Sequence, residues 1–416
     1  MTDRALPRLG TIAGYPRYLS ARIAAWIGNV MSLVALPVLI YQLTGSAGLT
    51  GLLAAAGALP YLLLGLPAGA LADRWDSRRT IAGWSTVAGA AMLSVSVAHA
   101  LGVLTPSHVM VTAFVVGMAF VFADAAGFGA LPRLVGRANV GRATASQSAI
   151  YTVISIAGPG AAGLLITLVG PAWVVGLDGV GYLVEAVLIA RLPLPRVRPK
   201  ASGRPRLLTD VAEGLRFVWR HHVIRVLTLV GLGLALTAGG AVSALTVVVG
   251  VEAFGFADDD PRLGVLYMAA SVGSFGGSML VTRLQRRFRV GTITLAGLGI
   301  TAAVVTALAL TADWIVGVAL LAALNAAMMV VILNAIVVRQ TLTPLRLQSR
   351  VNTTARMISW GGSPVGTSLG GLIAGAGGIR LALLVCAAGV LVSLLAGLAM
   401  GARRIDRLDR LTPVED

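Results

Sequence analysis

Three acidic residues lie inside long apolar runs of the sequence, where an ionisable side chain is costly. Asp124, Asp178 and Glu185 are each surrounded by small and aliphatic residues. An acid at the centre of a membrane costs about 2.5–3.5 kcal/mol on insertion scales, so its presence there indicates a function. A buried carboxyl group can take up and release a proton near neutral pH. We therefore expect these acids to act in proton coupling or substrate binding, with hydrogen bonding between packed helices as the alternative.

Amide and hydroxyl side chains form a second set of candidates. Gln147, Tyr151 and Ser155 recur every four residues, which places them on one face of a helix. Asn325 and Asn334 lie in another apolar run. Such polar faces suit the lining of a cavity that binds an amphipathic molecule, and they equally suit hydrogen bonding that holds two helices together. Both alternatives remain open for each residue.

A charged turn follows one of the apolar runs, in the stretch from Gly65 to Thr80. Gly65 and Gly69 are four residues apart, and this spacing favours a close approach to a neighbouring helix. The turn itself carries four charged residues in a fixed spacing, namely Asp73, Arg74, Arg78 and Arg79. The simplest interpretation is a basic loop that stays in the cytoplasm. That interpretation explains the arginines, but it does not explain the glycines or the Asp-Arg pair.

A third pattern combines a proline with two glycines. Gly158, Pro159 and Gly163 lie within one apolar run, and Ser363-Pro364 with Gly366 repeats the arrangement in the second half of the chain. Proline removes a backbone hydrogen bond and bends a helix, while glycine allows tight packing. The pattern therefore predicts a bent, closely packed helix in each half.

The elements that must position these residues are membrane-spanning helices. The chain is 57% hydrophobic and 12% charged, with a mean hydropathy of +0.86, whereas a soluble domain is about 25% charged. A membrane helix needs about 20 apolar residues. Twelve runs qualify, and we expect spans at Tyr18–Tyr41, Leu49–Leu71, Ile81–Val103, Val109–Ala130, Thr144–Leu168, Ala172–Ile189, Val223–Val249, Leu263–Val281, Thr292–Leu310, Trp314–Val338, Val351–Ala374 and Leu381–Ala402.

The spans divide the chain into two halves of six helices each. We expect a tail at 1–17, a first half at 18–190, a basic linker at 191–222, a second half at 223–402 and a tail at 403–416. The halves echo each other, because the Gly65/Gly69 turn recurs at Gly273/Gly277. Two similar halves of the same topology are the parallel repeat found in one class of secondary transporters.

The basic residues fall almost entirely on one side of this arrangement. The chain has 33 Lys and Arg residues and a net charge of +16. All but Arg262 and Arg380 lie in the two tails, the linker and alternate loops or adjoining helix ends. The positive-inside rule therefore predicts that both termini and the linker are cytoplasmic. We attribute the net charge to this topology and expect no nucleic-acid partner.

The charged turn resembles a signature of the major facilitator superfamily. The pattern G-x-x-x-D-R-x-x-x-R-R of its helix 2–3 loop is matched at Gly69, Asp73, Arg74, Arg78 and Arg79, although Asp76 replaces a frequent glycine. Segments beginning at Ala21, Phe122 and Arg339 are similar to the drug:proton antiporter branch, which includes macrolide-efflux pumps and the enterobactin exporter. Asn29 stands where members often carry aspartate.

The resemblance implies an all-α membrane protein with twelve helices in two pseudo-symmetric halves. It identifies Gly158, Pro159 and Gly163 with the helix 5 motif of antiporters. It also implies that helices 2 and 11 meet between the halves. We expect Asp73 to act there as a conformational latch on the start of helix 11, where Arg350 and Arg356 lie. The alternative is that Asp73 pairs only with Arg74 or Arg78 in its own turn.

These features predict a transporter rather than an enzyme. No Walker loop, zinc-ligand spacing or nucleophile elbow is present, and we expect no cofactor or metal. The expected function is proton-coupled export of amphipathic small molecules by a monomer in a bacterial inner membrane, with the substrate, protons and membrane lipid as partners. Siderophore export, lysophospholipid flipping and a non-transporting scaffold are the alternatives, and the intramembrane acids argue against the last.

Overall fold

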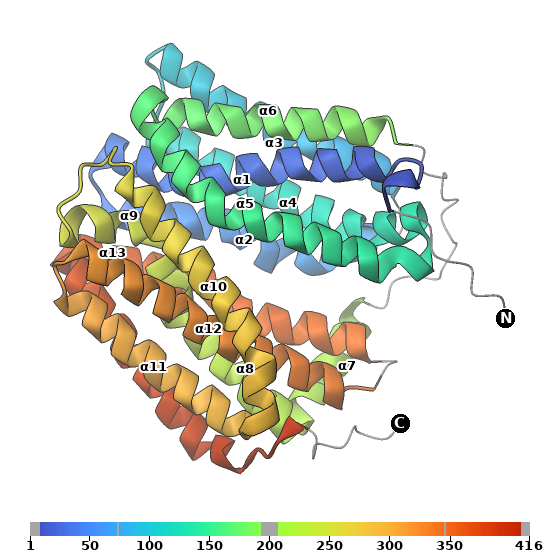
Figure 1. The fold of residues 1–416 in the computed structure, drawn as a ribbon, viewed down its shortest axis with the longest axis vertical. Helices are drawn as coiled ribbons and strands as arrows, with labels where there is room; N and C mark the ends of the chain where they lie inside the picture. Colours follow the sequence, from blue (N-terminus) through green and yellow to red (C-terminus); the bar gives the residue numbers. More distant parts are fainter. Residues whose placement is uncertain (1–8, 73–74, 193–206, 345–346, 409–416) are drawn as a thin grey trace. The chain divides into compact units, whose positions relative to one another are not determined.

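The computed structural model of the chain describes residues 9–72, 75–192, 207–344 and 347–408, and these ranges are helical without strands (Figure 1). The helices of the first part of the chain are α1 (Tyr15–Thr44), α2 (Ala47–Ala72), α3 (Ser77–Ala100), α4 (Pro106–Val135), α5 (Val140–Val169) and α6 (Pro171–Ala190). The helices that follow are α7 (Leu207–Arg220), α8 (His222–Leu234), α9 (Thr246–Val248), α10 (Arg262–Arg287), α11 (Val290–Leu310), α12 (Trp314–Leu342) and α13 (Gln348–Ala399).

Eleven helices in the described ranges are long and apolar enough to cross a membrane. The chain is therefore an all-helical, multi-pass membrane protein. The longest helix, α13, has 52 residues and is interrupted at Gly378, whose φ of 79° and ψ of 164° are not helical. The helix restarts at Ile379, whose backbone N–H donates to Glu252 Oε2 at 3.2 Å. A left-handed glycine and a capped restart are features of a boundary between two helices.

The segment that follows α8 departs from α-helical geometry. The structure contains π-helical stretches at η3 (Ala235–Val242) and η4 (Val249–Ala253) on either side of α9, where the sequence predicts one continuous span. A π-helix shifts the backbone hydrogen bonds by one residue, and such stretches are common at functional sites. The hydroxyl of Thr237 donates to the carbonyl of Gly233 at 2.8 Å, which provides a partner where the helical register changes.

The chain forms two compact units, of which unit 1 comprises Met1–Leu39 and Ala56–Pro205, and unit 2 comprises Ile40–Ala55 and Arg206–Asp416. In unit 1, α3 packs extensively against both α4 and α6. The close approach expected at Gly65 is not observed, because a Cβ atom placed there would have no neighbour within 4 Å. Helix α2 instead approaches α4 at Gly117, where an added Cβ would lie 2.3 Å from the carbonyl oxygen of Gly57.

Unit 2 contains a helix that the sequence did not predict. Helix α7 lies inside the expected linker at 191–222 and packs against α8 and α13. Its Glu213 forms an ion pair with Arg350 at the start of α13. A Cβ atom at Gly214 would lie 2.6 Å from Thr354 Oγ1, so the two helices are in close contact. Part of the linker is therefore an ordered helix that is attached to α13.

Glycines also bring helices of unit 2 together. On α10, Cβ atoms placed at Gly273 and Gly277 would lie 2.0 Å and 2.4 Å from carbonyl oxygens of α12. On α13, Gly366 and Gly370 meet Leu236 and Ala241 of η3 in the same way. These contacts involve backbone atoms or buried side chains, so an additional methyl group would force the helices apart.

A pair of neighbouring glycines on α10 tests this packing. We expect Gly273→Ala to destabilise the protein by about 1–3 kcal/mol, because the new methyl group would overlap the backbone of α12. Gly276→Ala is the matched control, since a Cβ atom at Gly276 has no neighbour within 4 Å. Thermal unfolding in detergent should show a lower midpoint for the first variant only. Equal midpoints for the two variants would contradict the glycine-mediated contact.

Candidate functional site

Helix α6 packs against both α1 and α3 in unit 1 and lies beside them in Figure 1, and small residues make this packing possible. A Cβ atom at Gly181 would lie 2.7 Å from the carbonyl oxygen of Ala24 on α1. On the opposite side, a Cβ atom at Gly179 would lie 2.9 Å from the carbonyl oxygen of Gly89 on α3. The backbones of three helices are therefore in close contact, and the acidic residues of α6 are buried between them.

Glu185 is held by partners from two helices. Its Oε1 accepts a hydrogen bond from Arg22 Nη1 at 2.8 Å, and its Oε2 accepts one from Ser85 Oγ at 2.9 Å. The Glu185 side chain is 2% exposed and the Arg22 side chain is 22% exposed. Both carboxylate oxygens are therefore satisfied, and the ion pair connects α1 to α6. A charge buried in this way is tolerated because it is paired and hydrogen-bonded.

Two aromatic rings continue this network away from Glu185. The guanidinium carbon of Arg22 lies 5.4 Å from the ring centroid of Trp26, within the range of a cation–π interaction. Trp26 in turn meets Tyr151 of α5 edge to face, with 5.5 Å between the ring centroids and an interplanar angle of 72°. Tyr151 is 43% exposed. An aromatic surface thus adjoins the buried charges.

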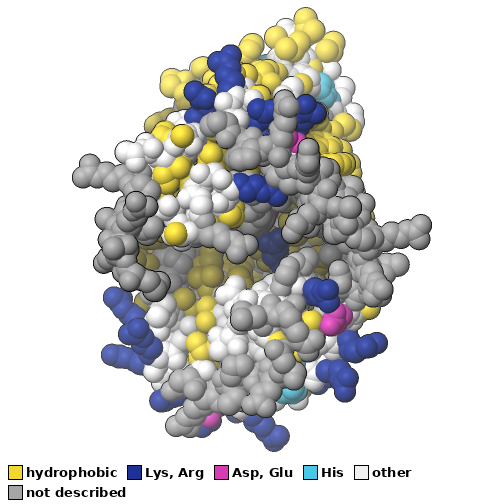
Figure 2. Space-filling view, turned by 90° about the vertical axis from the view of Figure 1, so that its right-hand side faces the viewer, with side chains coloured by type: hydrophobic (Ala, Val, Ile, Leu, Met, Phe, Trp, Pro, Cys, Tyr) yellow, Lys and Arg dark blue, Asp and Glu magenta, His cyan; other side chains and the backbone are white. Residues whose placement is uncertain are grey.

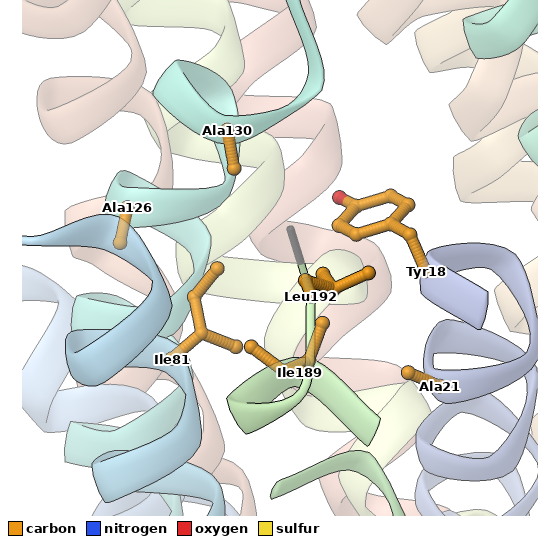
Figure 3. Packing of buried hydrophobic residues seen from close by; sticks show 7 residues of the cluster. All are labelled: Tyr18, Ala21, Ile81, Ala126, Ala130, Ile189 and Leu192. Atoms are coloured by element: carbon orange, nitrogen blue, oxygen red, sulfur yellow. The ribbon is translucent and has the colours of Figure 1, made fainter. Parts of the chain in front are cut away.

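An apolar cluster closes one end of the charged network (Figure 3). Its members come from α1, α3, α4, α6 and the segment just after α6, and they are Tyr18, Ala21, Ile81, Ala126, Ala130, Ile189 and Leu192. Tyr18, Ile81 and Ile189 are each one helical turn from Arg22, Ser85 and Glu185, respectively. The cluster therefore excludes water from this side, which strengthens the ion pair between Arg22 and Glu185.

Asp178 occupies a different environment from Glu185. It is 0% exposed, and neither carboxylate oxygen has a hydrogen-bond partner of good geometry among the described residues. Ser32 of α1 is close to the carboxylate, but its hydroxyl is also unsatisfied. A Cβ atom placed at Gly28 would lie 2.3 Å from Asp178 Oδ1, so α1 directly covers the acid. One turn further along α6, Asn29 Nδ2 donates to Tyr182 Oη at 3.4 Å.

The third predicted acid, Asp124, is half-buried on α4. Its charge acts on Arg22 and on Tyr18, so it belongs to the same electrostatic group as Glu185. Arg22 is not among the residues predicted from the sequence, because a base near the end of a span is also explained by the positive-inside rule. A signal was present, because Arg22 lies within the expected span Tyr18–Tyr41. A base at that position needs an acidic partner, and Glu185 provides it.

The predicted amides make local or packing contacts. Gln147 Nε2 donates to the carbonyl oxygen of Ala143 at 3.4 Å, and Asn325 Nδ2 donates to that of Leu321 at 2.9 Å. Asn334 is fully buried, and its side-chain amide forms hydrogen bonds with Gln285 of α10 and with Val290 and Thr294 of α11. These contacts connect Asn334 to two neighbouring helices, which agrees with hydrogen bonding between packed helices.

The proline–glycine pattern on α5 lies against α1. A Cβ atom at Gly158 would lie 2.7 Å from Val30 Cγ1, and both Pro159 and Gly163 are buried. Pro159 lies inside the helix, as Pro364 does in α13. The close packing expected at Gly158 is therefore present, and it brings α5 against the same helix that contacts α6.

The charged turn is described only in part. Gly69 lies in α2, whereas Asp73 and Arg74 are outside the described residues, so the latch stays a prediction. Arg78 Nη1 donates to the carbonyl oxygen of Leu192 at 3.5 Å. Arg350 contacts Glu213, and Arg356 also makes an interaction. Within the described ranges, no group of three His, Cys, Asp or Glu residues forms a possible metal site.

Comparisons with known proteins agree with this architecture. A family model for a transmembrane secretion effector of the major facilitator superfamily matches residues 17–414. The chain is 31% identical to the multidrug efflux pump Tap of Mycobacterium tuberculosis over 289 residues, which cover 67% of this chain and 68% of Tap. It is 28% identical to the enterobactin exporter EntS of Escherichia coli over 381 residues, 88% of each chain.

The fold is also shared with solved structures. A bacterial homologue of the human lysosomal transporter Spinster superposes with a TM-score of 0.74 at 15% sequence identity, over 96% of this chain and 98% of that one. At this identity the likeness concerns the fold alone. The match of the family model over nearly the whole chain is decisive, and this protein belongs to the transmembrane secretion effector family of major facilitator transporters.

Proposed function

We propose that this protein exports amphipathic small molecules across the bacterial inner membrane in exchange for protons, by alternating access. The similarity to Tap and EntS supports the direction of transport. The observation that carries proton coupling is the environment of Asp178, a carboxyl group buried without a hydrogen-bond partner among the described residues. An ionised carboxylate in such a place is very costly unless it is paired, whereas the protonated acid is much less so.

In this proposal, Asp178 and Glu185 have different roles on the same face of α6. Asp178 carries the proton, because the covering residue Gly28 leaves no room for a permanent cationic partner. Glu185 stays ionised and holds Arg22 in place. A shift of α1 relative to α6 would expose Asp178 to water and allow the proton to leave. Proton release would thus be coupled to a movement of α1.

We further propose that the aromatic surface beside the network contacts the substrate. Trp26 and Tyr151 offer ring faces to an amphipathic molecule, and Tyr151 is accessible. Gln147 lies one turn from Tyr151 on α5 and adds an amide to the same face. Asp124, half-buried near Arg22, adds a negative charge that would favour cationic amphiphiles.

We propose twelve membrane spans in two six-helix halves, with the tails, linker and boundaries predicted from the sequence. The break at Gly378 supports this count, because it divides α13 into two helices that are each long enough to span a membrane. Gly158 packs on α1, and Gly366 packs on η3. Both glycines belong to the proline–glycine pattern that occurs once in each half, so their packing supports a repeat. The many Lys and Arg side chains on the face seen in Figure 2 agree with the positive-inside rule, which supports cytoplasmic termini.

Two alternatives share this architecture and differ only in the exported molecule. Siderophore export is favoured by the 28% identity to EntS, which extends over 88% of the chain. Lysophospholipid flipping would require lipid substrates to be moved between leaflets. Transport by purified protein in liposomes, with a cationic drug, a siderophore and a lysolipid compared side by side, would distinguish the three. Proton-dependent movement of the drug alone is the result that the proposal expects.

Membrane topology provides a first test. We expect reporter fusions placed after Ser202 and after Asp260 to report opposite sides of the membrane, with Ser202 in the cytoplasm. The reason is that nearly all of the 33 basic residues fall on the side of Ser202. Paired alkaline phosphatase and green fluorescent protein fusions at each position give complementary signals. The same side for both positions would exclude the proposed topology.

Proton coupling is tested by neutral substitution of the buried acid. In Asp178→Asn, we expect efflux driven by a pH gradient to fall to the level of empty liposomes, because an amide of the same shape cannot carry a proton. The fold should be retained, since a neutral side chain is cheaper than a carboxylate at this buried position. The measurement is drug efflux from proteoliposomes at matched protein content, with and without an imposed gradient.

The control for this experiment is Asp258→Asn, which removes an exposed acid that lies outside the membrane helices and should leave transport unchanged. Asp124→Asn is measured in parallel, because it would weaken drug binding in our proposal and leave the pH dependence of the remaining efflux intact. Wild-type gradient-driven efflux by Asp178→Asn would assign Asp178 to helix packing.

The ion pair between Arg22 and Glu185 is tested by a double-mutant cycle. Glu185→Gln alone should lower stability by about 1–3 kcal/mol, because it removes the carboxylate that pairs directly with the partly exposed Arg22. Adding Arg22→Gln should recover part of that loss, with a coupling of about 1 kcal/mol between the two sites. Denaturant unfolding in mixed micelles measures both quantities. Strictly additive effects would mean that the contact contributes nothing to stability.

A further inference from the structure

The chain turns back on unit 2 after its last membrane helix. Helix α13 is followed by Gly401, whose left-handed φ of 77° is typical of a residue that ends a helix. A short 3-10 helix, η5 (Ala402–Arg404), comes next. Ala402 is 0% exposed, and Ile405 just beyond η5 is 3% exposed. Residues 401–407, called the strap below, are therefore packed against the rest of unit 2.

The strap caps the start of α11 with its backbone carbonyl groups. The first N–H groups of a helix have no partner within that helix. The N–H of Val290 donates to the carbonyl oxygen of Asp406 at 3.2 Å. The N–H of Gly291 donates to the carbonyl oxygen of Ile405 at 3.4 Å. The strap thus supplies acceptors to the exposed end of the helix.

The corresponding helix of unit 1 is capped in a different way. Helices α3 and α11 each follow one copy of the turn that recurs between the halves. Helix α3 is capped by its own Asp76, which accepts a hydrogen bond from the N–H of Arg79 at 3.1 Å. Arg289 has this place in front of α11, and its side chain makes no capping hydrogen bond. In unit 2, the strap therefore replaces the missing side-chain cap.

A glycine at the start of α11 leaves the space that the strap occupies. A Cβ atom placed at Gly291 would overlap the carbonyl group of Ala402, and it would lie 3.4 Å from the carbonyl oxygen of Ile405. These nearest neighbours all belong to the strap. A methyl group at this position would therefore displace the strap before it disturbed a membrane helix.

The strap also contacts the turn that precedes α11. Arg407 Nη2 donates to the carbonyl oxygen of Arg287, the last residue of α10, at 3.3 Å. Asp406 Oδ1 forms an ion pair with Arg289 Nε at 3.4 Å. The strap thus connects the end of one membrane helix to the start of the next.

Charge and chain entropy both oppose this docking. Arginines crowd the strap and the end of α10 with its turn, and they are Arg283, Arg286, Arg287, Arg289, Arg403, Arg404 and Arg407. Asp406 is the acid among them, and its ion pair with Arg289 is exposed to solvent, where such pairs contribute little. Ordering the strap also costs backbone entropy. The docked state is therefore favoured by only a small margin.

We propose that the strap is a conformational switch, which docks on the α10–α11 turn and releases from it while the membrane helices stay folded. The docked strap holds Val290, whose carbonyl oxygen accepts a hydrogen bond from Asn334 Nδ2 at 3.1 Å. Gln285 of α10 donates to Oδ1 of the same Asn334 side chain at 3.0 Å. Release frees the start of α11 and loosens this connection between α10, α11 and α12. The switch is a property of unit 2 and is independent of the exported molecule.

Two variants release the strap in different ways. A chain that ends at Gly401 lacks the strap and keeps the glycine that follows α13. Gly291→Ala keeps the whole chain, and its methyl group displaces the strap while alanine remains favourable in a helix. Gly299→Ala on the same helix is the matched control, since a Cβ atom there has no neighbour within 4 Å. Asp406→Asn removes the ion pair, and its control is Arg403→Gln, which changes an exposed residue of the strap.

The measurement is hydrogen–deuterium exchange of the purified protein in micelles, followed on a peptide that spans residues 289–294. We expect exchange there to be about fivefold faster in the shortened chain and in Gly291→Ala, since a backbone hydrogen bond contributes about that factor. Asp406→Asn should raise the rate by about two- to fivefold, as expected for an exposed ion pair. Both controls should exchange as the wild type does. Peptides from the middle of α11 and α12 should stay protected throughout, which establishes that each variant is folded.

Three results would overturn the proposal. The first is unchanged exchange at residues 289–294 in the shortened chain, which would mean that α11 does not depend on the strap. The second is protection of the strap in the wild type as strong as that of the middle of α11, which would make the strap a permanent part of the fold. The third is an equal drop in thermal midpoint when Gly291→Ala is made in the full-length and the shortened chain, which would show that the methyl group overlaps something other than the strap.

Discussion

The structure of unit 1 depends on burying acidic side chains in a membrane helix, and glycines make this possible. Gly179 and Gly181 bring the backbone of α6 into contact with α3 and α1, which removes lipid and water from around Asp178 and Glu185. Without such contacts, each carboxylate would face hydrocarbon at a cost of several kcal/mol. The close packing is therefore the condition for the other features. These are the ion pair between Arg22 and Glu185, the hydrogen bond from Ser85 and the burial of Asp178.

The two acids on α6 show how neighbouring positions in one helix acquire different chemistry. Glu185 meets a base and a hydroxyl, whereas Asp178 meets the backbone of Gly28 and the hydroxyl of Ser32, which makes no hydrogen bond of good geometry. Opposite partners stabilise a charge, and their absence favours the neutral form. A pair of titratable groups in contrasting surroundings is a common arrangement where protein chemistry depends on a proton.

Much of the fold was predictable because membrane helices are recognised from long apolar runs, and the acids were conspicuous inside them. The predicted boundary between the last two spans agrees with the break at Gly378. Arg22 was missed because it lies near the end of a span, where a base is also explained by topology. No close neighbour is observed at Gly65 among the described residues, since glycine spacing gives a helix face but not the neighbour that this face meets. The helix α7 was missed because its charged residues resemble those of a linker.

The π-helical stretch η3 has a consequence for how this part of the chain tolerates change in length. A π-helix accommodates one more residue than an α-helix over the same contacts, so Ala235–Val242 behaves as an absorbed insertion. The π-helical stretch itself makes the close contacts with α13, because Leu236 and Ala241 of η3 meet Gly366 and Gly370. A loop would not be tolerated inside a membrane span, whereas a π-helical turn lets the span take up one more residue while its backbone groups stay hydrogen-bonded.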